Sequence, residues 1–193
     1  MDSKTFDLFF RKLSETGVSE DACDQLRETY GDVLSIGSFA QKQDSGLAYE
    51  GSLLETAIRR LAVFAYKVNE IYNERIRADQ KSVIKVCLLQ HISKAVRMVR
   101  STDDWRVKKL GEVYSFVNGG PAIGIGLHSL LMCHECGIMF TTDEAEAMTI
   151  IDKADDDLQA KYHSSMLTNV IKQANDILWV HAAETNRLNN ENG

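Results

Sequence analysis

Proline is scarce in this chain, and Pro121 is its single occurrence among 193 residues. Because proline removes an N–H donor and breaks helices, this scarcity favours long helices. No stretch approaches the roughly 18 consecutive apolar residues of a membrane-spanning helix. The N-terminus leads into an amphipathic segment and lacks the apolar core of a signal peptide. The sequence therefore predicts a cytoplasmic chain that neither spans a membrane nor is secreted through a signal peptide.

Cysteine and clustered positive charge are also scarce. The four cysteines are too few for a disulfide scaffold, which predicts a reducing compartment. Cys133 and Cys136 have the Cys-x-x-Cys spacing, but no second pair of ligands follows at a spacing typical of zinc sites, so packing in the core is favoured. The formal net charge is -6, and no run of lysine and arginine is dense enough to follow a phosphate backbone. Binding to nucleic acid is therefore disfavoured.

Apolar side chains recur every three or four residues through most of the chain, which predicts amphipathic helices. We expect helices over residues 3–16, 19–31, 49–76, 82–100, 126–136, 141–154 and 165–187, with 49–76 the longest. Residues 31–48 are expected to form a long loop, and residues 105–118 a short β-hairpin or an irregular insertion. The chain length suits one domain. The sequence thus predicts an all-α helical bundle over residues 1–188, followed by a disordered tail at 189–193.

Five segments resemble, in order, motifs of the HD-domain metal-dependent phosphohydrolases of bacteria and phages. Residues 49–56, Tyr-Glu-Gly-Ser-Leu-Leu-Glu-Thr, resemble the family's Tyr-Glu-Gly-Gly-Leu-x-Glu-His, and residues 88–94, Leu-Leu-Gln-His-Ile-Ser-Lys, resemble Leu-Leu-His-Asp-Ile-x-Lys. Residues 124–129 are similar to a Gly-His-Gly-Glu-Lys-Ser turn, residues 142–152 to a helix that begins Thr-x-Glu-Glu-Ala, and residues 174–177 to a terminal Ala-Asp-Met. The resemblance covers about residues 1–185 and implies an HD-like helical bundle.

The resemblance also implies where the metal ligands of the family would lie. In chain order, these positions are Thr56, Gln90, His91, Ile125, Asp152 and Asp176. Imidazole and carboxylate groups hold Mn, Fe, Mg or Ni in such sites, and most of the implied ligands are replaced by other side chains. Without a bound cation there is no activated water. The resemblance therefore implies a degenerate site with no cofactor and no catalytic residue.

These observations favour a catalytically inactive HD-fold protein that acts as a structural or protein-interaction component. Because the similar patterns belong to phage and mobile-element proteins, the expected partners are virion components, other accessory proteins or a second copy of the chain, located in the cytoplasm or a virion. One alternative is a divergent phosphohydrolase or nucleotidase that binds a divalent metal through His91, Asp152 and Asp176. Another is a nucleotide-binding module that keeps the pocket without the chemistry. Whether apolar side chains fill the pocket best separates these hypotheses.

Overall fold

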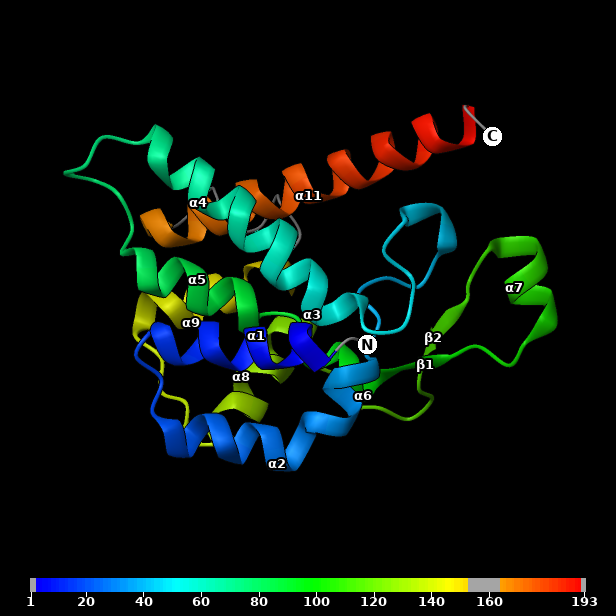
Figure 1. Ribbon diagram of the computed structural model, residues 1–193, viewed down its shortest axis with the longest axis horizontal. Coiled ribbons are helices and arrows are strands. Elements are labelled where there is room, and N and C mark those ends of the chain that lie inside the picture. The colour runs from blue at the N-terminus through cyan, green and yellow to red at the C-terminus, as the bar shows by residue number, and fades with distance from the viewer. Residues whose placement is uncertain (1–2, 153–163, 192–193) are drawn as a thin grey trace.

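The computed structural model describes residues 3–152 and 164–191, which are mostly helical with a small two-stranded antiparallel sheet (Figure 1). The prediction of an all-α fold with a short β-hairpin is therefore confirmed. The helices are α1 (Ser3–Glu15), α2 (Glu20–Ile36), α3 (Ser52–Thr56), α4 (Ala62–Ile71), α5 (Gln80–Leu89), α6 (Lys94–Arg97), α7 (Asp104–Leu110), α8 (Ile125–Glu135), α9 (Thr142–Thr149) and α11 (Met166–Glu191). The strands are β1 (Met98–Arg100) and β2 (Tyr114–Phe116), the 3-10 turns are η1 (Gln43–Ser45) and η3 (Ile150–Asp152), and η2 (Ala57–Leu61) is a π-helical segment.

The first two helices pack against each other through the aromatic side chains of α1. Helix α2 begins after Ser19, whose hydroxyl accepts a hydrogen bond from the N–H of Ala22 at 3.3 Å. The sequence predicted that this helix ends near Gly31, but it continues to Ile36. Gly31 lies inside the helix and packs closely against α1, since a Cβ there would be only 3.2 Å from the Phe6 ring. Contact between the two helices outweighs the ~1 kcal/mol that glycine costs within a helix.

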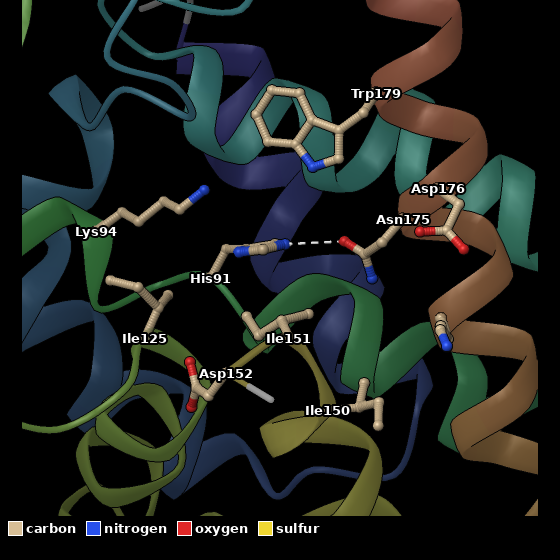
Figure 2. Close-up of a pocket in the computed structure, with 10 residues that line it drawn as sticks. His91, Lys94, Ile125, Ile150, Ile151, Asp152, Asn175, Asp176 and Trp179 are labelled. Atoms are coloured by element: carbon tan, nitrogen blue, oxygen red, sulfur yellow. Dashed lines mark hydrogen bonds between the residues drawn. The ribbon is translucent and has the colours of Figure 1, made fainter. Parts of the chain in front are cut away.

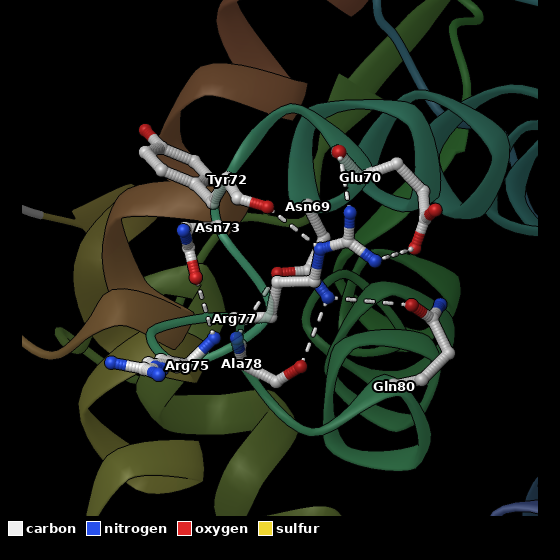
Figure 3. A network of polar contacts seen from close by, with 8 residues as sticks. All are labelled: Asn69, Glu70, Tyr72, Asn73, Arg75, Arg77, Ala78 and Gln80. Carbon is white, nitrogen blue, oxygen red and sulfur yellow. Dashed lines mark hydrogen bonds and ion pairs between the residues drawn. The ribbon is translucent and has the colours of Figure 1, made fainter.

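The connection between α4 and α5 explains why the predicted helix over 49–76 is shorter than expected (Figure 3). The helical path runs from residue 52 through α3, η2 and α4, and ends at residue 71. The Arg77 guanidinium donates to the backbone carbonyls of Glu70 at 2.8 Å and Tyr72 at 2.7 Å. The Asn69 amide exchanges two hydrogen bonds with the backbone of Ala78, at 2.9 and 3.1 Å. These side chains satisfy the backbone groups at the helix end, which a helix otherwise leaves without partners.

The helix predicted over residues 82–100 is broken at its centre. Helix α5 ends at Leu89, and a turn over residues 90–93 leads into α6 and then β1. Helix α8 holds this turn, because the Ser93 N–H donates to the Ser129 hydroxyl at 3.0 Å and the Ser93 hydroxyl donates to the Ile125 carbonyl at 2.8 Å. These bonds link residues more than 30 positions apart in the sequence. Helical periodicity within the segment contains no sign of them.

Residues 98–116 form an arm that projects from the helical body (Figure 1). Strands β1 and β2 pair in an antiparallel register that sets Met98 opposite Phe116. Between them, α7 is capped by Asp103, whose carboxylate accepts hydrogen bonds from two N–H groups of the first turn. The insertion predicted near 105–118 is thus present, but its first strand lies earlier and a helix occupies much of the predicted range.

Helix α11 packs against α4, α5 and α9. With 26 residues it is the longest helix in the described ranges, in place of the one predicted over 49–76. The helix was predicted to end at Arg187 and to be followed by a tail at 189–193, but it continues to Glu191. Residues 192–193 lie outside the described residues. Helix α9 ends at Thr149, earlier than its predicted end at residue 154, which also lies outside the described residues.

The buried core is apolar and draws on helices from α1 to α11. Cys133 and Cys136 are both buried within it, in agreement with the predicted packing role. In the described parts of the chain, no helix combines the length and the hydrophobicity that crossing a membrane requires.

Candidate functional site

A cavity of about 450 Å³ opens between the turn after α5, the start of α8, the turn η3 and one face of α11 (Figure 2). Its lining consists of His91, Lys94, Ile125, Ile150, Ile151, Asp152, Lys172, Asn175, Asp176 and Trp179. Four of the six positions implied by the resemblance therefore lie around one cavity, although they come from segments far apart in the sequence. The other two, Thr56 and Gln90, are buried and do not line it.

At the base of the cavity, three neutral side chains form a buried polar network. The Asn175 amide group donates to the Gln90 side-chain oxygen at 3.2 Å and to the Ile171 carbonyl at 2.9 Å. Its oxygen lies 3.1 Å from His91 Nε2. Because the amide nitrogen faces two oxygen acceptors, its oxygen faces His91, which then donates from Nε2. His91 is thereby held by α11 as well as by the turn that carries it.

His91 is a neutral imidazole in this setting. Burial is the main cause that lowers its pKa well below the ordinary 6.5, and the nearby Lys94 charge lowers it further, while the hydrogen bond to Asn175 opposes both. The ring packs edge-on against Phe39, with 4.7 Å between centroids. His91 Nδ1 has no hydrogen-bond partner among the described residues. A neutral ring that donates from Nε2 has Nδ1 as its acceptor, and here Nδ1 is buried without a donor among the described residues.

The residue of α11 that contacts His91 is Asn175, whereas the resemblance pointed to Asp176. Asp176 is exposed and lies on the rim of the cavity (Figure 2). Successive residues of a helix point in different directions, so a shift of one position decides which side chain faces inward. An ungapped alignment could have identified Asn175 from the sequence, because Ala174 and Asn175 then match the Ala-Asp pair of the motif. In that alignment, an amide replaces the final carboxylate.

The Asp152 carboxylate serves as a cap for helix α8. It accepts hydrogen bonds from the N–H groups of Gly126 at 2.9 Å and Leu127 at 2.8 Å. Gly124 stands at the N-cap position and has no side chain to do this. A Cβ on Gly124 would overlap the Asp152 carboxyl group, and one on Gly126 would overlap the Met148 carbonyl. The glycines of this turn therefore permit close packing of α8 against η3 and α9.

Lys94 brings the positive charge closest to His91. Its ammonium donates to the Phe39 carbonyl at 2.8 Å and lies 4.1 Å from the centre of the Phe39 ring and 5.9 Å from that of Trp179. Burial lowers the pKa of Lys94 to about 7. Near neutral pH the group is therefore divided between its charged and neutral forms. Lys94 belongs to the motif at residues 88–94 but not to its implied ligand positions, and Trp179 lies outside all five motifs.

These residues do not fit a divalent metal ion. The positions of the implied first ligands hold Thr56, Gln90 and His91, and within the described ranges the Thr56 hydroxyl and the Gln90 amide nitrogen have no hydrogen-bond partner. Asp152 directs both carboxylate oxygens at backbone N–H groups. Across residues 3–152 and 164–191, no three His, Cys, Asp or Glu side chains are placed to share an ion. The Lys94 ammonium in the same lining would repel a dication and attract an anion.

No family model, curated protein or solved structure matches this chain.

Proposed function

We propose that this chain is a catalytically inactive HD-like domain that binds a small anionic ligand of the nucleotide class. The observation that carries the proposal is the cavity itself, which stays open at about 450 Å³ and has Lys94 in its wall. Small-molecule sites commonly have volumes of roughly 300–1,000 Å³, with a few polar groups among apolar ones. A domain kept only as a scaffold would be expected to fill such a space with side chains.

The lining suits an anion that carries a planar ring. Lys94 provides a charge in a setting from which water is partly excluded, where electrostatic attraction is stronger than in bulk water. Trp179 provides a half-exposed aromatic face at the same cavity. Together Lys94 and Trp179 suit a phosphate and a planar ring, which are two components of a nucleotide.

A metal-dependent phosphohydrolase is the less supported alternative. It would need His91, Asp152 and Asp176 to share one cation, and Asp152 already satisfies two N–H groups of α8. His91 uses Nε2 in its contact with Asn175. Hydrolysis would therefore require two sets of structural hydrogen bonds to be given up.

A protein-interaction component is the second candidate, and the arm supports it. The exposed large apolar side chains of the arm and the residue after it are Val99, Trp105, Leu110, Phe116 and Val117. Clustered exposed apolar side chains are typical of surfaces that contact other proteins. A virion or accessory role and a phage origin rest on the sequence resemblance alone. Light scattering of the chain and of a Trp105→Ala variant tests self-association, which the variant should weaken.

The main proposal is tested by thermal unfolding in the presence of nucleoside mono-, di- and triphosphates. Ligand at 100 times its Kd adds about 2.7 kcal/mol, which for a domain of this size raises Tm by about 5–10 °C. Lys94→Met should abolish the shift while keeping the apolar bulk of the side chain. Lys67→Met, at an exposed position of α4, is the matched control and should keep the shift.

Two results would overturn the proposal. One is the absence of any stabilisation across the nucleotide series with the unmodified chain. The other is phosphate release with Mn, Co or Ni that is lost in Asp176→Ala, which would establish the hydrolase instead.

A further inference from the structure

A second cavity of about 350 Å³ adjoins the first, and the two share Lys94 and Trp179 in their linings. Figure 2 shows Lys94 and Trp179 on the same side of the first cavity, opposite Asp152 and Ile150. The second cavity continues beyond them, and its lining consists of Phe39, Ala40, Gln41, Lys42, Asp44, Ser45, Lys94, Met98, Phe116 and Trp179. One side of it is formed by the residue 39–45 segment and another by the arm.

The second cavity differs from the first in chemistry, because three aromatic side chains and Met98 line it beside the polar residues Gln41, Lys42, Asp44, Ser45 and Lys94. Met98 and Phe116 face each other across β1 and β2, so their side chains lie on the same face of the small sheet. Phe39 and Trp179 have ring centroids 5.7 Å apart and provide further aromatic surface. Methionine and aromatic side chains adapt to flat apolar groups and stack on them. This cavity therefore suits a planar ring, and no histidine lines it.

We infer that a single ligand spans both cavities, with its phosphate beside Lys94 and its planar ring in the second cavity between Phe116, Met98 and Trp179. The inference rests on the proposed function and names the ligand class more closely, as an aromatic phosphate such as a nucleoside monophosphate. The phosphate lies on the first-cavity side of Lys94, and the sugar lies between the phosphate and the ring, at the boundary formed by Lys94 and Trp179. The arm thereby acts as the wall that selects the ring.

The position of Lys94 supports this arrangement. Its ammonium lies over the Phe39 ring, at the boundary that both cavities share. A phosphate on the first-cavity side of Lys94, the side of His91 and Asn175, leaves the sugar and the ring to extend toward Phe116. Each cavity alone lies near the lower end of the volume range of small-molecule sites, so a ligand with two different ends uses both.

The test uses Trp179 as its reporter in a Trp105→Phe background, because the chain contains only these two tryptophans. Trp105 is an exposed residue of α7 and lines neither cavity. The probes are the four ribonucleoside 5′-monophosphates and ribose 5-phosphate, titrated by fluorescence and calorimetry. Stacking of a base on an aromatic side chain strengthens binding by about tenfold. At least one monophosphate should therefore quench Trp179 and bind about tenfold more tightly than ribose 5-phosphate.

Two variants separate the cavities. Phe116→Ala should weaken the monophosphate about tenfold and leave ribose 5-phosphate unchanged, whereas Lys94→Met should weaken both. Val99→Ala truncates an exposed side chain on the opposite face of the same strand and should change neither, which controls for damage to the arm.

The two proposals fail in different ways. Equal affinity for the monophosphates and ribose 5-phosphate, with no effect of Phe116→Ala, would overturn the two-cavity ligand and leave the anion site in place. No binding of any probe would overturn both proposals.

Discussion

Asn175→Ala tests whether the buried network at the base of the cavity stabilises the fold. The Asn175 amide is the described side-chain partner of both the Gln90 oxygen and His91 Nε2. Gln90 and His91 are 0% and 5% exposed. Leaving a buried polar group without a partner costs about 1–3 kcal/mol, so losing the amide should cost about 2–6 kcal/mol for the two groups. Because alanine has a higher helix propensity than asparagine, the substitution also adds less than 1 kcal/mol to the free energy of unfolding.

We therefore expect a net loss of about 2–5 kcal/mol in the free energy of unfolding. Urea denaturation should show this as a lower midpoint with an unchanged m-value. Asn169→Ala is the matched control, because Asn169 is an exposed residue of the same helix, and it should change stability by no more than about 0.5 kcal/mol. A loss below 1 kcal/mol for Asn175→Ala would refute the reasoning, because it would mean that Gln90 and His91 obtain equivalent hydrogen bonds from water.

Three further predictions concern the same region. The folded-state pKa of His91 lies well below 6.5, so the unfolded chain binds the extra proton first as the pH falls. The free energy of unfolding should therefore decrease below pH 6.5, by up to about 1.4 kcal/mol per pH unit. Denaturation from pH 7 to 5 should show a weaker pH dependence of this free energy in His91→Gln than in the exposed control His134→Gln. Asp152→Ala should lower stability by about 1 kcal/mol through loss of the α8 cap, whereas Asp152→Asn should keep most of it, and equal losses in both would contradict the capping role. Because the pKa of Lys94 is about 7 and an anion prefers its charged form, the Kd for a nucleotide should rise about fivefold from pH 7 to pH 8, and an affinity independent of pH would exclude Lys94 as the anion-binding group.

Local periodicity predicted where helices form more reliably than where they end. The apolar face of α1 and the position of α8 followed from residues within each helix. The end of α2, by contrast, lies at Ile36, beyond the glycine at which the sequence pattern placed it. The break after α5 depended on hydrogen bonds from Ser93 to α8. Such contacts join residues distant in the sequence, so a pattern read within one segment does not contain them.

The motif series named six positions for the candidate site. Four of them, His91, Ile125, Asp152 and Asp176, lie around one cavity, whereas Thr56 and Gln90 do not line it. The motif series did not indicate that Asn175 would hold His91, or that Asp152 would direct its carboxylate at α8. A carboxylate in a sequence is equally suited to bind a ligand, a metal or a helix end. The backbone placed next to it decides among these uses.

The amino-acid sequence alone determined the helical character of this chain and the residue types available to the site, because helix formation and side-chain chemistry are local properties. Tertiary structure decided how those residues are used. His91 meets Asn175 from 84 positions away, and Lys94 and Trp179 converge between two cavities only when α11 packs against the earlier helices. Burial, hydrogen-bond partners and open volume belong to the packed molecule, so only the folded chain shows that these side chains line two adjoining cavities.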